Sequence, residues 1–278
     1  MQTAASLRQE PRHTPLPPPA VTASVGRLVV RLAESAAEVA AAQALRYRVF
    51  YDEMKALPSA EMAARRQDFD AFDDACDHLL VVDPDRPAGE EVVGTYRLIR
   101  EEVAKAKGGF YSSSEYDLSS LVGRQPNARF LELGRSCVHP DYRNNTTIQL
   151  LWRGITAYIL AHGIDYMFGC GSLPGTDPDA LALPLAYLHH EFLAPPHIRV
   201  RAQDHLFVSM DRMAKDAINP RAALRTLPPL IKGYLRLGGY VGEGAVVDRQ
   251  FNTTDVFILV PVDRIADRYQ TRLEVKVD

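Results

Sequence analysis

The sequence predicts a single α/β domain, in which a mixed central sheet is flanked by helices and followed by a C-terminal extension. Three observations predict it. Short apolar runs typical of strands alternate with amphipathic segments of helical period. A strand, a helix and a second strand succeed one another over residues 129–171, an order that indicates a crossover between parallel strands. One more apolar run, at residues 255–262, returns a strand to the sheet after a largely helical stretch.

The first hundred residues are expected to hold a helix and a set of strands. Ser35 is placed to cap a helix that runs to about Met54, and a short helix follows Pro58. The Pro-, Asp- and Gly-rich turn at residues 84–89 joins two of the strands in a hairpin. The predicted strands are residues 27–32, 78–83 and 91–100.

The middle of the chain has the strongest periodicity. Apolar residues between 148 and 159 recur at offsets that fall on one helical face, which predicts a helix from about Asn145 to His162. Gly163 follows at the position where helices commonly end. The flanking strands are predicted at residues 129–138 and 165–171.

The C-terminal part is predicted to continue with a helix, one or two strands, a helical stretch broken at Pro228–Pro229 and the last strand. A basic stripe lies along the broken stretch, interleaved with leucines. It indicates either a surface for anionic lipid or an acidic partner, or an amphipathic helix packed on the core. The first three of these segments are residues 179–192, 197–210 and 221–237, and the stripe is Arg221, Arg225, Lys232 and Arg236.

Composition narrows the function classes. A net charge of −3 and a pI near 6.3 argue against a nucleic-acid binder. The three cysteines are odd in number and widely spaced, so neither a disulfide framework nor a metal site is expected, and a cytoplasmic location fits best. Residues 1–26 are Pro-rich and polar and are predicted to be a disordered tail, with the folded domain at 27–278. No stretch is long and apolar enough to span a membrane, which leaves open a peripheral contact with the inner membrane.

The central strand carries two charges, Glu132 and Arg135, among apolar residues. Strand alternation would put them on opposite faces of a buried sheet. A β-bulge at Gly134 would bring both to one side and splay the strand, leaving N–H groups free to polarise a thioester carbonyl. Glu132 could then deprotonate an attacking amine, directly or through water. The alternative is a structural Glu132–Arg135 ion pair.

The residues after this point carry a specific resemblance. The segment VHPDYR, Val138 to Arg143, resembles the strand-to-helix junction of GNAT acyltransferases, whose backbone amides hold the pyrophosphate of coenzyme A. Here the continuation NNTT has no glycine, which favours the single phosphate of a phosphopantetheine arm on acyl carrier protein. The resemblance implies an acyl-donor site at Ser136, Cys137, Val138, Arg143, Asn144, Asn145 and Thr146.

A scattered set of charged and aromatic positions is similar to acyl-homoserine-lactone synthases, GNAT-like enzymes that draw acyl groups from acyl carrier protein. In that family the charged residues form a network around the acyl-transfer centre. The resemblance implies the same for Arg46, Phe50, Asp70, Asp73, Arg97, Glu132 and Arg135.

A broader resemblance links residues 27–270 to the L-ornithine Nα-acyltransferases, also labelled hemolysin-like, in segments such as LRYRVFYDEM, YSSSEYDLS and GGYVGEGAVVDRQFNTTDVFILV. It implies transfer of a 3-hydroxyacyl group from acyl carrier protein to the α-amine of ornithine, giving lyso-ornithine lipid without a tightly bound cofactor. The acceptor's side-chain ammonium needs an acidic partner. The candidates are Asp73, Asp74, Glu243, Asp248 and Asp255.

Two other functions stay open at the level of sequence. One is an acyltransferase with another acceptor, either a different amino acid or S-adenosylmethionine as in the lactone synthases. The other is a membrane-lytic or membrane-binding protein, for which the sequence offers no spanning segment.

Overall fold

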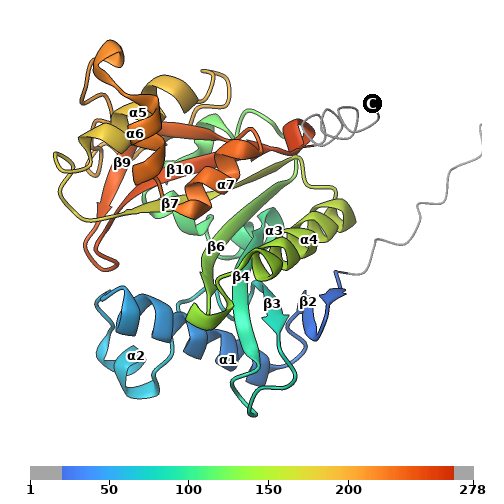
Figure 1. Cartoon of the computed structure of the whole chain (residues 1–278). Helices are drawn as coiled ribbons and strands as arrows, with labels where there is room; N and C mark the ends of the chain where they lie inside the picture. Colours follow the sequence, from blue (N-terminus) through green and yellow to red (C-terminus); the bar gives the residue numbers. More distant parts are fainter. Residues whose placement is uncertain (1–20, 266–278) are drawn as a thin grey trace, which may run out of the picture.

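The computed structural model describes residues 21–265, and within them ten strands form one extended sheet (Figure 1). The sheet has the order β1-β2-β3-β4-β6-β7-β10-β9-β8-β5. The strands are β1 (Ala23–Val25), β2 (Leu28–Leu32), β3 (Asp77–Val82), β4 (Val92–Arg100), β5 (Tyr116–Asp117), β6 (Phe130–Val138), β7 (Tyr166–Pro174), β8 (Arg201–Ala202), β9 (Tyr240–Asp248) and β10 (Thr253–Pro261).

The start of the first helix and the end of the fourth lie where the sequence predicts them, whereas α3 was not predicted. Ser35 caps the first helix by accepting a hydrogen bond from the backbone N–H of Glu38, and Gly163 ends the fourth in a left-handed conformation. The first helix runs directly into a π-helical turn, η1 (Arg48–Glu53). The α-helices are α1 (Ala36–Tyr47), α2 (Ala60–Arg65), α3 (Glu101–Ala106), α4 (Asn145–His162), α5 (Ala182–Phe192), α6 (Pro220–Thr226) and α7 (Pro229–Arg236).

The sheet is mixed, as the sequence predicts. Its neighbouring strands are antiparallel except at two places, β6–β7 and β8–β9. The β6–β7 pair is joined by α4, so the predicted crossover between parallel strands is confirmed.

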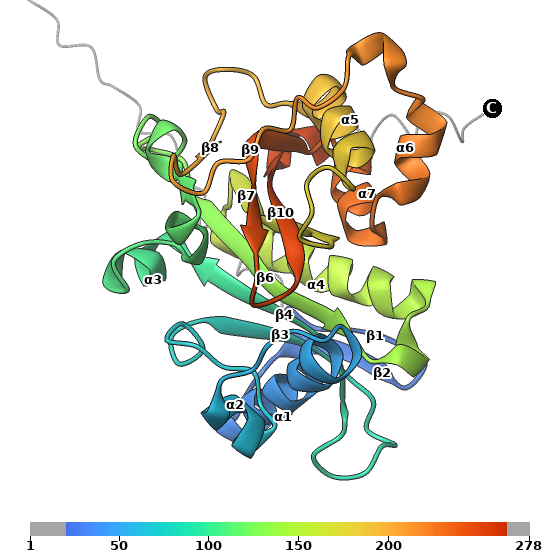
Figure 2. The same cartoon turned by 90° about the vertical axis from the view of Figure 1, so that its left-hand side faces the viewer.

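Strand alternation divides the core between the two faces of the sheet. Leu79 and Val81 of β3 belong to the cluster that includes the buried residues of α4, whereas Leu80 between them packs with Leu45 of α1. Helix α4 lies so close to β3 that a Cβ on Gly154 would stand 2.8 Å from a methyl group of Leu79. Figure 2 shows α1 and α2 beyond one side of β3 and β4, and α5, α6 and α7 gathered around β7, β9 and β10.

Strands β6 and β7 pair only over a short stretch before they separate. The register runs from Phe130 opposite Tyr166 to Glu132 opposite Phe168, and β7 then pairs with β10 along its whole length. Gly169 sits where the separation begins, and a Cβ there would lie 2.2 Å from the carbonyl oxygen of Leu133. Beyond Glu132 the sheet therefore opens between its two central strands.

Several expectations need correction. Strand β1 at Ala23–Val25 falls inside the stretch predicted as a disordered tail, because it pairs with β2; residues 1–20 lie outside the described residues. Strand β9 was not predicted, and only two residues of 197–210 form a strand, β8. The basic stripe belongs to α6 and α7, and the apolar face of α7 packs on the core through Ile231 and Leu235, which favours the amphipathic-helix interpretation.

Within residues 21–265, no helix combines the length and the apolar character that crossing a bilayer requires.

The close approach at Gly169 gives a prediction about stability. Gly169→Ala would force β7 away from β6 and is expected to lower the free energy of unfolding by about 1–3 kcal/mol or more. Gly134→Ala is the matched control, because a Cβ at Gly134 meets nothing within 4 Å. Denaturant unfolding checks both variants. Equal stabilities would contradict the close contact between the two strands.

Candidate active site

A fully buried arginine lies at the centre of the charged residues that the sequence pointed to. Arg46 projects from α1 and is 0% exposed. Its Nε donates to Asp68 Oδ2 at 2.7 Å, and its Nη1 and Nη2 donate to the two carboxylate oxygens of Asp73 at 2.6 and 2.9 Å. Burial alone would raise the pKa of Asp73, but the hydrogen bonds and charge of Arg46 outweigh it and hold that pKa below its usual value.

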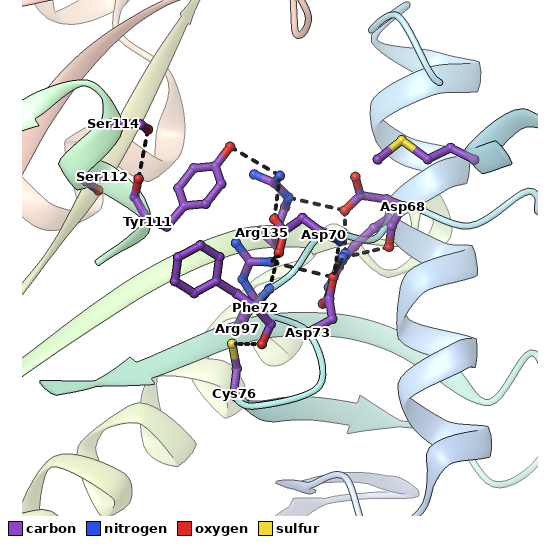
Figure 3. Close-up of polar contacts among 12 residues, drawn as sticks. Asp68, Asp70, Phe72, Asp73, Cys76, Arg97, Tyr111, Ser112, Ser114 and Arg135 are labelled. Carbon is purple, nitrogen blue, oxygen red and sulfur yellow. Dashed lines mark hydrogen bonds and ion pairs between the residues drawn. The ribbon is translucent and has the colours of Figure 1, made fainter. Parts of the chain in front are cut away.

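Two further arginines reach the same aspartates from neighbouring strands of the sheet. Arg97 of β4 donates to Asp70 Oδ1 at 2.6 Å. Arg135 of β6 donates to Asp70 Oδ2 at 3.1 Å, and its Nε lies 3.2 Å from Asp68 Oδ2 (Figure 3). Formal charges balance in this arginine–aspartate network, which consists of Arg46, Asp68, Asp70, Asp73, Arg97 and Arg135.

Aromatic rings cover the network. The ring of Tyr111 packs against the guanidinium groups of Arg97 and Arg135, with its centroid 5.2 Å from the first and 4.8 Å from the second. Phe251 stacks on Arg135 from another side at 5.0 Å. Phe50, which the sequence placed in the network, makes an edge contact with Phe251 at 5.7 Å and so supports the network through that ring.

The predicted β-bulge is present, one residue later than expected. Thr95 of β4 stands opposite Cys137 and Arg97 stands opposite Gly134, so Arg135 and Ser136 together face one residue of β4. Arg135, and not the neighbouring Gly134, takes a left-handed conformation, with φ of 49°. The contacts of Arg135 with Asp68 and Asp70 hold this conformation in place.

Glu132 lies on β6 just before the bulge and is 2% exposed. Its Oε2 accepts a hydrogen bond from the backbone N–H of Tyr111 at 2.7 Å, and its Oε1 accepts from the N–H of Ser112 at 2.8 Å and from the Ser112 hydroxyl. No ion pair links Glu132 to Arg135 among the described residues, so the structural alternative weighed from the sequence is wrong. Tyr111 instead bridges them, because its phenol contacts Arg135 while its N–H binds Glu132.

Burial dominates the electrostatics of Glu132. Removal from water raises its pKa, while the hydrogen bonds from Ser112 and Tyr111 and the charge of Arg97 oppose the rise without cancelling it. A carboxyl group with a raised pKa accepts a proton more readily at neutral pH than an exposed one does. The arrangement is therefore suited to general-base chemistry.

The residues expected to bind the acyl donor lie at the far end of β6 and the start of α4. Asn144 caps α4 by accepting from the N–H of Thr147 at 3.1 Å, and Asn145 and Thr146 form the first helical turn. Arg143 is engaged by Glu53, its Nη2 donating at 2.6 Å, and its Nε donates to the carbonyl of Val138. The charge of Arg143 is therefore already neutralised at this junction.

The other two donor-site residues occupy the bulged part of β6. Ser136 is partly exposed and is one of the two bulged residues. Cys137 is buried, and burial raises the pKa of its thiol to about 12, which leaves it protonated and a poor nucleophile at neutral pH.

The acceptor candidates separate into distinct environments. Asp74 is exposed and Asp248 accepts from the N–H groups of Gln250 and Phe251, so Asp248 shapes the turn that carries Phe251. Asp73 belongs to the network, and Glu243 lies near Arg199 and Arg201 at 4.0 and 3.5 Å. Asp255 of β10 is 6% exposed, and its Oδ1 has no hydrogen-bond partner in the described chain.

Three contributors to this site were not predicted from the sequence. Asp68 and Phe251 lie in loops or turns, and Tyr111 begins a single short 3-10 turn, so periodicity gives no signal for any of them. The spacing of Asp68, Asp70 and Asp73 in one short segment is the only local hint for Asp68.

The residues of this site lie in a segment that matches a known family. The family described as Acetyltransferase (GNAT) domain matches residues 45–153, a segment that contains all three arginines, all three aspartates and Glu132. The chain is 53% identical to the L-ornithine N(alpha)-acyltransferase of Rhizobium meliloti (strain 1021), over 90% of this chain and 85% of that protein. It is 52% identical to the protein of that name from Brucella abortus (strain 2308), over 88% of each.

Among solved structures, FeeM, an N-acyl amino acid synthase from uncultured soil microbes, superposes with a TM-score of 0.49 at 14% identity, covering 87% of this chain and 94% of that one.

The matched domain and the named relatives define the chain as an acyltransferase of the GNAT class. Identity above 50% across most of both chains goes further: the protein belongs to the L-ornithine N(alpha)-acyltransferase family.

The burial of Arg46 leads to a stability prediction. Arg46→Met would leave Asp68 and Asp73 buried without their shared cation and is expected to cost about 3–5 kcal/mol. Arg66→Met removes an exposed ion pair with Asp52 and should cost less than about 1 kcal/mol. Urea unfolding measures both.

The Arg46→Met penalty should also depend on pH. The lowered pKa of Asp73 stabilises the fold above the ordinary Asp pKa of about 4, and this contribution is lost as the pH falls further. The difference between wild type and Arg46→Met should therefore narrow below about pH 4. A constant difference would contradict the charge-based explanation.

Proposed function

We propose that the protein transfers a 3-hydroxyacyl group from acyl carrier protein to the α-amine of L-ornithine, giving lyso-ornithine lipid. The observation that carries the proposal is the buried Glu132 beside the β6 bulge, at the point where β6 and β7 separate. The name shared by the relatives supports ornithine as the acceptor.

The reaction joins the acceptor nitrogen to the acyl carbon and breaks the carbon–sulfur bond. Glu132 takes a proton from the ammonium or amine, directly or through one water molecule, which frees the nitrogen lone pair for attack. The tetrahedral intermediate then expels the thiolate of phosphopantetheine, which leaves with a proton. Because Glu132 is held by two backbone N–H groups, its carboxylate keeps one orientation through this cycle.

The bulged end of β6 would polarise the thioester carbonyl. Strand separation after Glu132 frees the β7-facing side of β6 from a regular ladder, and backbone N–H groups near Ser136–Val138 would donate to the developing oxyanion. The arginine–aspartate network keeps Arg135, and with it the bulge, in a fixed position.

The start of α4 would take the donor's phosphate. The N–H groups of Asn145 and Thr146 lie at the positive end of an 18-residue helix, where an anion is favoured. Asn144 already accepts from the N–H of Thr147, and Glu53 already pairs with Arg143. The junction therefore has fewer free donors and less positive charge for a larger anion. These features support a single phosphate over the pyrophosphate and further phosphate of coenzyme A.

The first test concerns the base. Glu132→Gln keeps the size of the side chain but removes its basicity, and it is expected to lower kcat for acylornithine formation by about 10²–10⁴-fold. Mass spectrometry of the product from 3-hydroxyacyl carrier protein and ornithine gives the rate. Glu102→Gln, an exposed surface change, should leave the rate unaltered. Full activity in Glu132→Gln would remove Glu132 from this role.

The second test concerns the donor. With the same acyl chain and saturating ornithine, the carrier-protein thioester should give a kcat/KM at least about tenfold above the coenzyme A thioester, a difference of about 1.4 kcal/mol. Equal or better use of the coenzyme A thioester would overturn the donor assignment while leaving the acceptor assignment intact.

A further inference from the structure

A second cluster of acidic groups lies close to Glu132 and has no role in the network. Glu115 follows η2 (Tyr111–Ser114), Cys170 lies on β7 and Asp255 on β10. One ligating atom of each lies within 4.8 Å of the others. Two carboxyl groups and a thiol from three separate parts of the chain therefore meet at one point, where Asp255 is buried and Glu115 and Cys170 are partly exposed.

The pair of carboxyl groups lacks a cation. No Lys or Arg of residues 21–265 comes within ion-pair distance of Glu115 or Asp255, and Asp255 Oδ1 is buried without a hydrogen-bond partner. The side chain of Glu115 accepts a weak hydrogen bond from the Cys170 thiol at 3.4 Å. Buried carboxylates are ordinarily paired, so the unpartnered oxygen of Asp255 is costly to the isolated protein.

Both Glu115 and Asp255 have raised pKa values. Burial raises the pKa of Glu115 to about 7 and that of Asp255 to about 6. The negative charge of Asp255 adds to the rise at Glu115. Asp248 adds to the rise at both groups, and Arg135 opposes it for both. Ser172 and Thr253 face Asp255 and limit its rise. At neutral pH the binding of a cation would therefore favour the state in which both carboxyl groups are ionised.

The cluster connects directly to the proposed transfer centre. The Ser112 hydroxyl donates a hydrogen bond to Glu132, and it also accepts a weak hydrogen bond from the Cys170 thiol at 3.6 Å. Cys170 in turn contacts Glu115. Two side chains, Ser112 and Cys170, thus lie between Glu115 and the carboxylate that would deprotonate the acceptor's amine.

We infer that Glu115 and Asp255 form the subsite for the side-chain ammonium of the acceptor amino acid. The inference rests on the proposed function and adds to it the residues that select a diamino acid. Ornithine carries its second nitrogen roughly 6 Å from the α-nitrogen when extended, given bonds of about 1.5 Å. With the α-amine at Glu132, the side-chain ammonium reaches toward the acidic pair.

The chemistry of the cluster favours an ammonium ion over a metal ion. An ammonium group has three donors, and the site supplies acceptors on two carboxylates and on the Ser172 hydroxyl. A metal ion that used all three groups would have to displace the proton of the Cys170 thiol, whose pKa burial and the nearby carboxyl groups raise well above its ordinary value.

The test compares ornithine with norvaline, which has the same carbon chain without the second amine. In the wild type, ornithine should have a KM about ten- to hundredfold below that of norvaline, as expected for hydrogen bonds to a charged group. Glu115→Gln and Asp255→Asn should each raise the KM for ornithine and leave that for norvaline unchanged, so the preference collapses. A purely structural role would change thermal stability but not the ratio of the two KM values.

The control is Glu243→Gln, which changes an acidic residue on the neighbouring strand β9 that lies near Arg201. Its preference for ornithine should equal that of the wild type. An unchanged ornithine-to-norvaline ratio in both Glu115→Gln and Asp255→Asn would overturn the inference. So would a preference that EDTA abolishes and zinc restores, because the subsite would then hold a metal.

A binding measurement separates this inference from the proposed function. If the wild type forms no acylornithine, the proposed function fails, but calorimetry still compares ornithine with norvaline binding in wild type and Glu115→Gln. Tighter binding of ornithine in the wild type alone supports the subsite. Equal binding of the two amino acids overturns it.

Discussion

The structure of the site depends on one buried cation. Arg46 is withdrawn from water and bound by Asp68 and Asp73, and a guanidinium in that position is tolerated only with such partners. The same two aspartates, with Asp70, then hold Arg135 and Arg97 on the adjacent strands. Helix α1, the segment around residues 68–73 and the centre of the sheet are joined through this one set of ion pairs.

The network explains why the β6 bulge takes its observed form. A left-handed arginine is uncommon, and here Arg135 adopts it so that its guanidinium meets Asp68, Asp70 and Tyr111. Tyr111 links this contact to Glu132, since one residue supplies both the phenol near Arg135 and an N–H on the carboxylate. Charge pairing, strand geometry and the proposed base are therefore parts of one arrangement.

The sequence predicted the elements with strong local signals and missed those decided by distant neighbours. Helix α4 has a clear apolar face with a cap at each end, and its bounds agree with the predicted helix from about Asn145 to His162. Strand β9 contains Gly242 and Gly244, which read as loop residues, yet Gly242 lies against Phe257 and a Cβ on Gly244 would strike Phe207. Those contacts come from other parts of the chain and leave no pattern in β9 itself.

The site shows the same division. Family resemblance indicated Arg46, Asp70, Asp73, Arg97, Glu132 and Arg135, and the structure brings the first four together with Arg135 while Glu132 lies across Tyr111. Tyr111, Glu115 and Phe251 escaped prediction because each acts from a loop or helix end. Their positions depend on packing against the sheet and not on any local period.

The central claim is that amide formation takes place at Glu132, in the opening between β6 and β7. A crystal structure with the acylornithine product bound tests it most directly. The account predicts that the amide nitrogen lies within about 2.6–3.2 Å of the Glu132 carboxylate, or one water molecule away, with the second nitrogen near Glu115 and Asp255. A product bound elsewhere, with Glu132 contacting only Tyr111 and Ser112, would contradict it.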